Sequence, residues 1–143
     1  MLSQKCKYAI RTVLYLSIEG NKSSPKGGKD ISTALKIPEA YTGKILQELA
    51  RKNIITSVKG PGGGFYLSEE NLNSPVINVI ETIDGLSLFE SCGLGLSKCS
   101  NDHPCPIHND FKVAREHLKK VFINKSVQEL ANEIKTHDFT LVR

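Results

Sequence analysis

Three of the four cysteines in this chain lie in one short segment, spaced as Cys92-x6-Cys99-x5-Cys105-x2-His108. Thiolate sulfur is a soft metal ligand and imidazole nitrogen a borderline one, so four such donors in sequence suit zinc or an iron–sulfur cluster. Structural zinc sites usually contain a tight Cys-x2-Cys pair, and its absence here lowers the case for zinc without excluding it. Three free, partly buried thiols and a thiol switch are the other interpretations of the segment.

The fourth cysteine, Cys6, stands far from this segment, in the first predicted helix. A half-buried helix cysteine that fills space is the favoured interpretation, and a ligand that reaches across a dimer is the alternative. The apolar stretch from Tyr8 to Ile18 is interrupted by Arg11 and Thr12 and has no small-residue cleavage pattern behind it. We therefore expect neither a signal peptide nor a membrane span, and we expect a cytoplasmic protein whose thiols stay reduced.

Two closely joined helices are expected upstream of the cysteines. The first begins at an N-cap on Asp30 and ends near Ile37, and the second covers residues 38–53 with Pro38 in its first position. Such a pair predicts a helix-turn-helix, whose second helix presents its N-terminal residues to base edges in the major groove of DNA. Gly43 within that helix costs about 1 kcal/mol relative to alanine, so it marks either a close approach to DNA or a tolerated weakness.

A glycine-rich turn at residues 59–64 separates two strand-like segments, 54–58 and 65–67. A phosphate-binding loop would require a Lys-Ser/Thr pair and then a helix, and neither follows here. The segment therefore predicts a β-hairpin, which is either a plain structural hairpin or a wing that contacts DNA beside the recognition helix. The residues expected to contact DNA are Glu39, Tyr41, Thr42, Lys44, Gln47, Ser57, Lys59, Gly60, Pro61, Gly62 and Gly63, with Tyr41, Thr42, Lys44 and Gln47 on the outward face of the helix.

Charge is distributed unevenly along the chain. Residues 1–70 carry eleven Lys/Arg against six Asp/Glu, whereas residues 71–143 carry eight against nine. The basic half contains the predicted helix-turn-helix and wing, which favours an anionic partner, although charge alone is equally well interpreted as a solvated basic face. With 39% hydrophobic and 24% charged residues, the chain has the composition of an ordinary globular protein.

Further helices are expected to frame these features. One begins at Ser3 and ends at Gly20, another follows Ser74, and residues 85–108 are expected to be irregular. A long helix from about residue 106 carries a narrow apolar stripe that suits a seam between two helices, and a capped helix from Ser126 and a mobile tail follow it. The stripe consists of Ile107, Phe111, Ala114, Leu118, Val121 and Phe122.

The expected fold is mainly α with a small β-hairpin wing. It comprises a winged helix-turn-helix domain over residues 1–85, a cysteine-containing loop over 86–108, and a dimerisation helix and tail over 106–143. We expect a two-fold homodimer, because the apolar stripe is too large to leave exposed on a small chain. Two recognition helices would then face a near-palindromic site in double-stranded DNA. An enzyme is the rival class, but no acid–base pair or cofactor fingerprint accompanies the cysteines.

These motifs resemble those of the Rrf family of transcription regulators over nearly the whole chain. The most specific matches are Ile37-Pro38 followed by Tyr41 and Lys44, the run Leu49-Ala50-Arg51-Lys52-Asn53-Ile54-Ile55, and residues 57–65. The resemblance implies a homodimeric repressor or activator, with a repressor favoured, that senses iron–sulfur status, redox state or nitric oxide. The family often has leucine where Thr42 stands and arginine where Lys59 stands, so no operator sequence can be borrowed from a relative.

The resemblance also bears on the cysteine segment. Cluster-binding members of the family carry three cysteines here, and in one type a histidine two residues beyond the third cysteine completes the site. This implies that Cys92, Cys99 and Cys105 hold a 2Fe–2S or 4Fe–4S cluster with His108 as the fourth ligand, zinc being the alternative metal. The gap between the first two cysteines is six residues here rather than the usual five.

Overall fold

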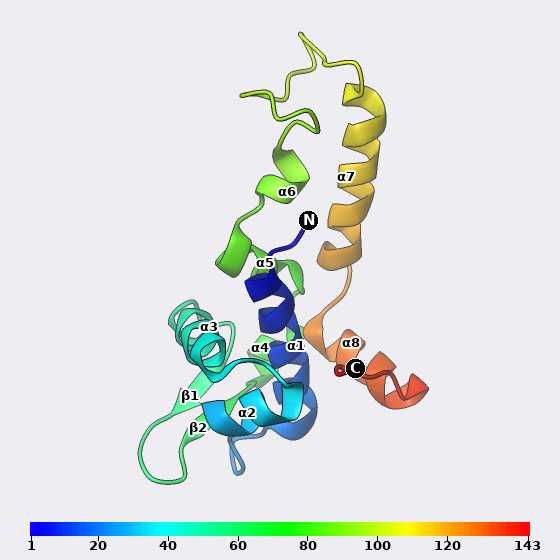
Figure 1. The fold of residues 1–143 in the computed structure, drawn as a ribbon. Helices are drawn as coiled ribbons and strands as arrows, with labels where there is room; N and C mark the ends of the chain where they lie inside the picture. The colour runs from blue at the N-terminus through cyan, green and yellow to red at the C-terminus, as the bar shows by residue number, and fades with distance from the viewer.

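Helix α1 (Gln4–Glu19) lies at the centre of the computed structural model, which describes residues 1–143 (Figure 1). The Ser3 hydroxyl accepts a hydrogen bond from the Cys6 backbone N–H and caps the helix, as predicted. One face of α1, which includes Leu16, is fully buried, and helices α2, α3, α5 and α8 all pack against it. This helix therefore positions the DNA-reading elements and the C-terminal part of the chain.

The predicted helix-turn-helix is formed by α2 (Gly28–Leu35) and α3 (Glu39–Arg51). Lys36 closes α2 in a left-handed conformation, φ 52°, and turns the chain toward the second helix. The N-cap of α2 is Gly27 rather than Asp30, so that prediction was wrong. Asp30 is the third residue of the helix, and its carboxylate accepts the Gly27 N–H at 3.3 Å, which is the reciprocal half of a capping box.

The predicted hairpin consists of β1 (Thr56–Val58) and β2 (Gly64–Tyr66), paired antiparallel with Ser57 opposite Phe65. A third segment completes its base, because Lys26 and Phe65 exchange two backbone hydrogen bonds of 2.9 and 2.8 Å. The stretch before α2 therefore serves in part as a strand partner for the wing.

Two glycines of the hairpin are required by close backbone contacts. A Cβ atom at Gly63 would lie 2.2 Å from the carbonyl oxygen of Val58, and one at Gly64 would lie 2.6 Å from that of Lys26. Any larger residue would push the two strands apart. The glycine run is thus partly explained by the packing of the hairpin itself.

The short helix α4 (Glu69–Asn73), which no sequence pattern predicted, ties the hairpin to the end of α3. The Asn71 side chain is buried, and its Oδ1 accepts the Thr56 hydroxyl at 2.8 Å while its Nδ2 donates to the Asn53 carbonyl at 2.8 Å. These bonds hold the first strand of the wing against the segment that leaves the recognition helix.

Three further helices, α5, α6 and α7, precede and follow the cysteine segment. Helix α5 (Ile77–Asp84) packs on α1, and α6 (Ser87–Glu90) and α7 (His108–Ile123) lie side by side and project away from the rest of the chain, at the top of Figure 1. Residues 91–107, between α6 and α7, contain no helix or strand, so the predicted irregular stretch of 85–108 was too long: it includes α6, and His108 already belongs to α7. No helix or strand therefore positions Cys92, Cys99 or Cys105.

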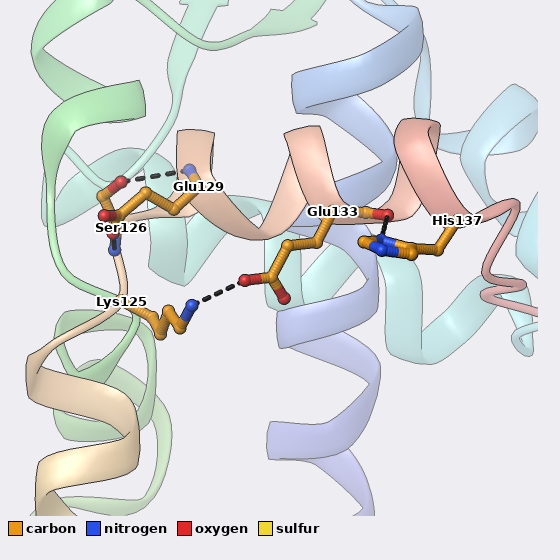
Figure 2. A network of polar contacts seen from close by, with 5 residues as sticks. All are labelled: Lys125, Ser126, Glu129, Glu133 and His137. Carbon is orange, nitrogen blue, oxygen red and sulfur yellow. Dashed lines mark hydrogen bonds and ion pairs between the residues drawn. The ribbon is translucent and has the colours of Figure 1, made fainter.

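Helix α8 (Val127–His137) begins with the predicted capping box, drawn in Figure 2. The Ser126 backbone N–H donates to the Glu129 carboxylate at 2.6 Å, and the Glu129 N–H donates to the Ser126 hydroxyl at 3.1 Å. An ion pair between Lys125 Nζ and Glu133 Oε1, 2.5 Å long, links the preceding loop to the same helix.

The last helix and the tail pack against α1. Val127 and Ala131 of α8 are buried, and α8 packs on α1, a contact that the division of the sequence at residue 106 did not anticipate. The tail, predicted to be mobile, contacts α1: Arg11 donates from Nε to the Leu141 carbonyl at 2.7 Å, and its Nη2 donates to the Leu35 carbonyl at 2.6 Å. No helix in the chain combines the length and the apolar content that crossing a membrane would take.

Candidate cysteine site and DNA interface

The exposed face of α3 carries most of the side chains predicted to read DNA. Glu39, Lys44 and Gln47 are exposed, and Tyr41 is 46% exposed. The Tyr41 ring packs edge-on against Tyr8 of α1, with ring centroids 5.7 Å apart. The ring is therefore held in place while one side of it stays open to a partner.

An ion pair fixes this helix on α1. Lys5 Nζ lies 2.5 Å from Glu48 Oε1, and a hollow of about 340 Å³ beside the pair is lined by Lys5, Ala40, Tyr41 and Lys44. The charge of Lys5 is balanced by Glu48, whereas Lys44 makes no ion pair and supplies the positive charge beside the N-terminal half of α3. Positive charge at this place favours the approach of a phosphate backbone.

Thr42 is not part of the exposed face. Its side chain is 1% exposed, and its hydroxyl donates to the Pro38 carbonyl at 3.2 Å. Thr42 precedes the buried Ile45 and Leu46 by three and four residues, so it shares their side of the helix. The prediction of an outward-facing Thr42 was therefore wrong, because its polar type concealed its place in the apolar 3.6-residue pattern.

The tip of the wing is exposed. Of the predicted contact residues in the wing, Gly63 is partly buried and the others are exposed: Ser57, Lys59, Gly60, Pro61 and Gly62. Lys59 is the only charged residue between Thr56 and Tyr66, so the charge of the wing rests on this one side chain.

The cysteine segment brings its four predicted ligands together as two pairs. Cys92 Sγ lies 3.7 Å from Cys105 Sγ, and neither cysteine is in a disulfide. Cys99 Sγ lies 3.4 Å from His108 Nδ1. Cys92 and His108 are buried, whereas Cys99 and Cys105 are partly exposed. The spacing in the sequence did not reveal which ligands would pair.

Two residues outside the predicted set contact the second pair. Asn101 Oδ1 lies 2.8 Å from His108 Nε2, and because an amide oxygen only accepts, Nε2 carries the proton and Nδ1 keeps its lone pair toward Cys99. Arg115 of α7 donates to Cys99 Sγ from both terminal nitrogens, at 3.6 and 3.5 Å. Arg115 lies seven residues after His108, on the same helix face, a signal that the sequence does contain; Asn101 has no such signal.

Arg115 is only 8% exposed, and its guanidinium joins the start of the cysteine segment to Cys99. It donates to the carbonyl oxygens of Glu90 and Ser91, directly before Cys92, and lies 5.5 Å from the centre of the Phe111 ring. Its Nε has no hydrogen-bond partner. Because a buried cation is stabilised by nearby negative charge, this environment suits an anionic cluster beside Arg115.

Two cysteines differ in how readily they ionise. Backbone N–H groups of Leu94 and Leu96 donate to the Cys92 sulfur and lower the pKa of this thiol, which favours the thiolate form that binds metals. Burial, reinforced by the Asp84 carboxylate, raises the pKa of the Cys6 thiol to about 12. Cys6 is fully buried in a small apolar cluster, where it fills space as expected.

The donor set is compatible with a 2Fe–2S cluster. In a 2Fe–2S cluster four protein ligands serve two irons, two to each. Two separate pairs of soft or borderline donors match that requirement.

Comparison with known proteins decides which family this architecture belongs to. A sequence profile named Rrf2, described as an iron-dependent transcriptional regulator, matches residues 2–133. The chain belongs to the Rrf2 family. An Aquifex aeolicus protein described as an HTH-type transcriptional regulator is 28% identical over 100% of this chain and 99% of its own length. The HTH-type transcriptional regulator IscR of Klebsiella pneumoniae is 27% identical over 92% of this chain and 79% of its own length.

Solved structures show the same fold. CymR, the global cysteine regulator of B. subtilis, superposes with a TM-score of 0.74 at 18% identity, over 93% of this chain and 97% of CymR. T. potens IscR gives a TM-score of 0.76 at 15% identity, over 98% and 92% of the two chains. The predicted class, mainly α with a hairpin wing, is confirmed. As a member of the Rrf2 family the chain is a DNA-binding transcriptional regulator and not an enzyme.

Proposed function

We propose that this Rrf2-family regulator acts as a homodimeric repressor on a near-palindromic duplex and senses whether an iron–sulfur cluster is bound. The cluster ligands would be Cys92, Cys99, Cys105 and His108. The observation that carries the proposal is the arrangement of these donors as two close pairs at the start of α7. Cluster occupancy would report iron–sulfur status or exposure to oxidants, and cluster loss would alter DNA binding.

DNA reading is assigned to α3 and the wing. Tyr41, Lys44 and Gln47 project from the exposed face of α3, where they would meet base edges, and Lys59 at the wing would meet a phosphate. Lys59→Ala should therefore weaken binding to all sequences and reduce the slope of log affinity against log salt by about one. Lys44→Ala should instead change the base preference in a selection from random duplexes. A selection that enriches no site, with either apo or cluster-loaded protein, would contradict this assignment.

The homodimer is inferred from the apolar side of α7. Ile107, Phe111 and Leu118 are each 37% exposed and Val121 is 50% exposed, and they lie beside the face of the helix that carries His108 and Arg115. Half-exposed apolar side chains along one helix favour association with a second copy. Light scattering at micromolar concentration should give a dimer mass, and Val121→Glu should shift the mass toward the monomer. A monomeric wild type with intact DNA binding would contradict the dimer.

A 2Fe–2S cluster is favoured over the 4Fe–4S alternative by the pairing of the donors. One pair, Cys92 and Cys105, would serve one iron, and the other pair, Cys99 and His108 through Nδ1, would serve the second. The bound cluster would supply a centre whose integrity depends on oxidants and on iron supply. Asn101 holds His108 in the tautomer that leaves Nδ1 free to bind.

Arg115 connects this site to the surface that would form the dimer. Its guanidinium contacts Cys99 and the end of α6. Arg115 itself belongs to α7, the proposed dimer helix. Loss of the cluster would change the charge that Arg115 faces and so change the contact between α6 and α7. A shift of α7 in both subunits would alter the spacing of the two recognition helices. The forms with and without the cluster would then bind the same duplex with different affinities.

Anaerobic purification with iron, sulfide and zinc assays tests the cluster. The wild type should contain about two irons and two acid-labile sulfides per chain, the content of a 2Fe–2S cluster. Alanine at any of Cys92, Cys99 or Cys105 should abolish the visible absorbance, His108→Ala should weaken it, and Cys6→Ala should leave it unchanged. Stoichiometric zinc without iron or sulfide after reconstitution would refute the cluster. Wild-type operator affinity and response in the triple alanine variant would refute its sensing role.

A further inference from the structure

The three cysteines of the segment are sorted by the fold into a pair and a single residue. Cys92 and Cys105 face each other with their sulfurs 3.7 Å apart, whereas the Cys99 sulfur lies against His108 and Arg115. We infer that, in the protein without a cluster, Cys92 and Cys105 form an intramolecular disulfide when they meet a peroxide, while Cys99 stays reduced. The consequence for gene regulation rests on the proposed function, but the chemistry does not.

Little movement is needed to close this disulfide. A disulfide bond is about 2.0 Å long, so the two sulfurs must approach by about 1.7 Å. Both cysteines lie in the stretch between α6 and α7 that has no helix or strand, so no ladder of backbone hydrogen bonds opposes that approach. Cys99 is held elsewhere by contacts from Arg115 and His108, which keep its sulfur away from the reaction.

A cavity gives a small oxidant access to one member of the pair. It has a volume of about 410 Å³ and reaches Cys92. A water molecule occupies about 30 Å³ in the liquid, so hydrogen peroxide has ample room there. The serines at its wall, Ser3, Ser87 and Ser91, offer hydroxyl groups that can hydrogen-bond to a peroxide. A peroxide can therefore reach the Cys92 sulfur through this cavity.

The chemistry proceeds in two steps. The Cys92 sulfur attacks hydrogen peroxide, the O–O bond breaks, an S–O bond forms, and the thiol becomes a sulfenic acid with release of one water. The Cys105 sulfur then attacks the Cys92 sulfur, the S–O bond breaks, the S–S bond forms, and a second water leaves. In total the two thiols lose two electrons and two protons, and one peroxide is reduced to two waters.

The disulfide would act as a lock on the sensing site. It consumes two of the four proposed cluster ligands, so the site cannot be reloaded until a thiol reductant restores both sulfurs. An oxidised cell would thereby hold the regulator in its cluster-free form even when iron and sulfide are present.

Peptide mapping of the full-length apo protein tests the pairing. The cluster is removed anaerobically with a chelator, the protein is treated with hydrogen peroxide, and the remaining thiols are blocked with N-ethylmaleimide. Cleavage after lysine and arginine and before aspartate separates the three cysteines, because Asp84, Lys98, Asp102 and Asp110 delimit peptides 84–98, 99–101 and 102–109. Mass spectrometry should find peptide 84–98 joined to 102–109, and peptide 99–101 alkylated.

Variants separate this inference from a general loss of structure. Cys99→Ser should form the same disulfide, and Cys6→Ser should behave like the wild type. Cys105→Ser should form none and should leave Cys92 as a sulfenic acid that dimedone labels. Linkage through Cys99, linkage between chains as the main product, or four intact thiols after peroxide treatment would overturn the inference.

The outcome is independent of whether a cluster forms. If reconstitution yields no cluster but the disulfide appears, the proposed cluster fails and the disulfide stands. If the cluster forms but the apo protein keeps all its thiols, the disulfide fails and the proposed function stands. The lock is tested separately. Cys105→Ser cannot be used for this test because it removes a proposed cluster ligand, so cluster reloading is measured on the oxidised wild type with and without dithiothreitol. Only the reduced sample should regain visible absorbance, and equal recovery without reductant would refute the lock.

Discussion

Replacing Gly43 by alanine tests how closely the recognition helix approaches DNA. Gly43 lies within α3, is exposed, and has no left-handed backbone conformation, and a Cβ atom built there meets nothing within 4 Å. Glycine in a helix interior is less favourable than alanine by about 1 kcal/mol. Gly43→Ala should therefore stabilise the free protein by about 1 kcal/mol, which corresponds to a rise of about 3 °C in Tm for a domain of this size.

DNA binding should respond in the opposite direction. Gly43 lies between Tyr41 and Lys44, so a duplex contacted by these two side chains would also meet the backbone at Gly43. Inserting a methyl group into a close contact costs about 1–3 kcal/mol, which is a loss of roughly 5- to 150-fold in affinity. Gly43→Ser should lower affinity at least as far, while gaining less stability because serine is a poorer helix former.

Both quantities can be measured on the same samples. Urea unfolding at a fixed protein concentration gives the change in stability, and fluorescence anisotropy with an operator duplex at fixed salt gives the change in affinity. A Gly43→Ala protein that is less stable than the wild type would refute the structural reasoning. A more stable protein with unchanged affinity would refute the close approach and leave Gly43 as a tolerated weakness.

Three further changes are expected to separate structural from DNA-reading roles. Gly63→Ala should cost about 1–3 kcal/mol of stability and weaken DNA binding, because its Cβ would lie 2.2 Å from the Val58 carbonyl oxygen; a wing unchanged by NMR would contradict this. Thr42→Val should cost about 0.5–1.5 kcal/mol through loss of its buried hydrogen bond, with base preference unchanged in a duplex selection. Hydrogen bonds from Ser126 lower the pKa of Glu129, so its stabilisation is present above the unfolded pKa of about 4.3 and is lost as pH falls through the lower folded value. The Tm difference between wild type and Glu129→Gln should accordingly shrink from pH 6 toward pH 3, and a difference that grows on acidification would contradict it.

Much of the fold was predictable because its signals are local. Ser3 and Ser126 each stand before an apolar 3.6-residue pattern, and both cap helices as predicted. The start of α2 was misplaced because Asp30 acts on the backbone N–H of Gly27, three residues earlier, rather than on the residues that follow it. Helix α4 is only five residues long and has no periodic pattern, so the sequence did not predict it.

The cysteine segment was predictable in composition but not in geometry. Residue types and spacing are enough to name Cys92, Cys99, Cys105 and His108 as donors, since donor chemistry depends on residue type. Their division into two pairs depends on the conformation of a stretch without helix or strand, where periodicity carries no information. The burial of Arg115 follows from long-range contacts with the end of α6, which no local pattern encodes.

Because α8 packs on α1, the packing of the first helix cannot be completed until the last helix has been synthesised. The end of α8 at His137 lies 118 residues after Glu19, the end of α1. At about 5–20 residues per second, roughly 6 to 24 s separate the two in a nascent chain. Until Val127 and its neighbours arrive, part of the apolar core built on α1 has no cover. A chain whose synthesis stalls before residue 127 therefore exposes that surface. Such a chain is a candidate for chaperone binding or degradation rather than for DNA binding.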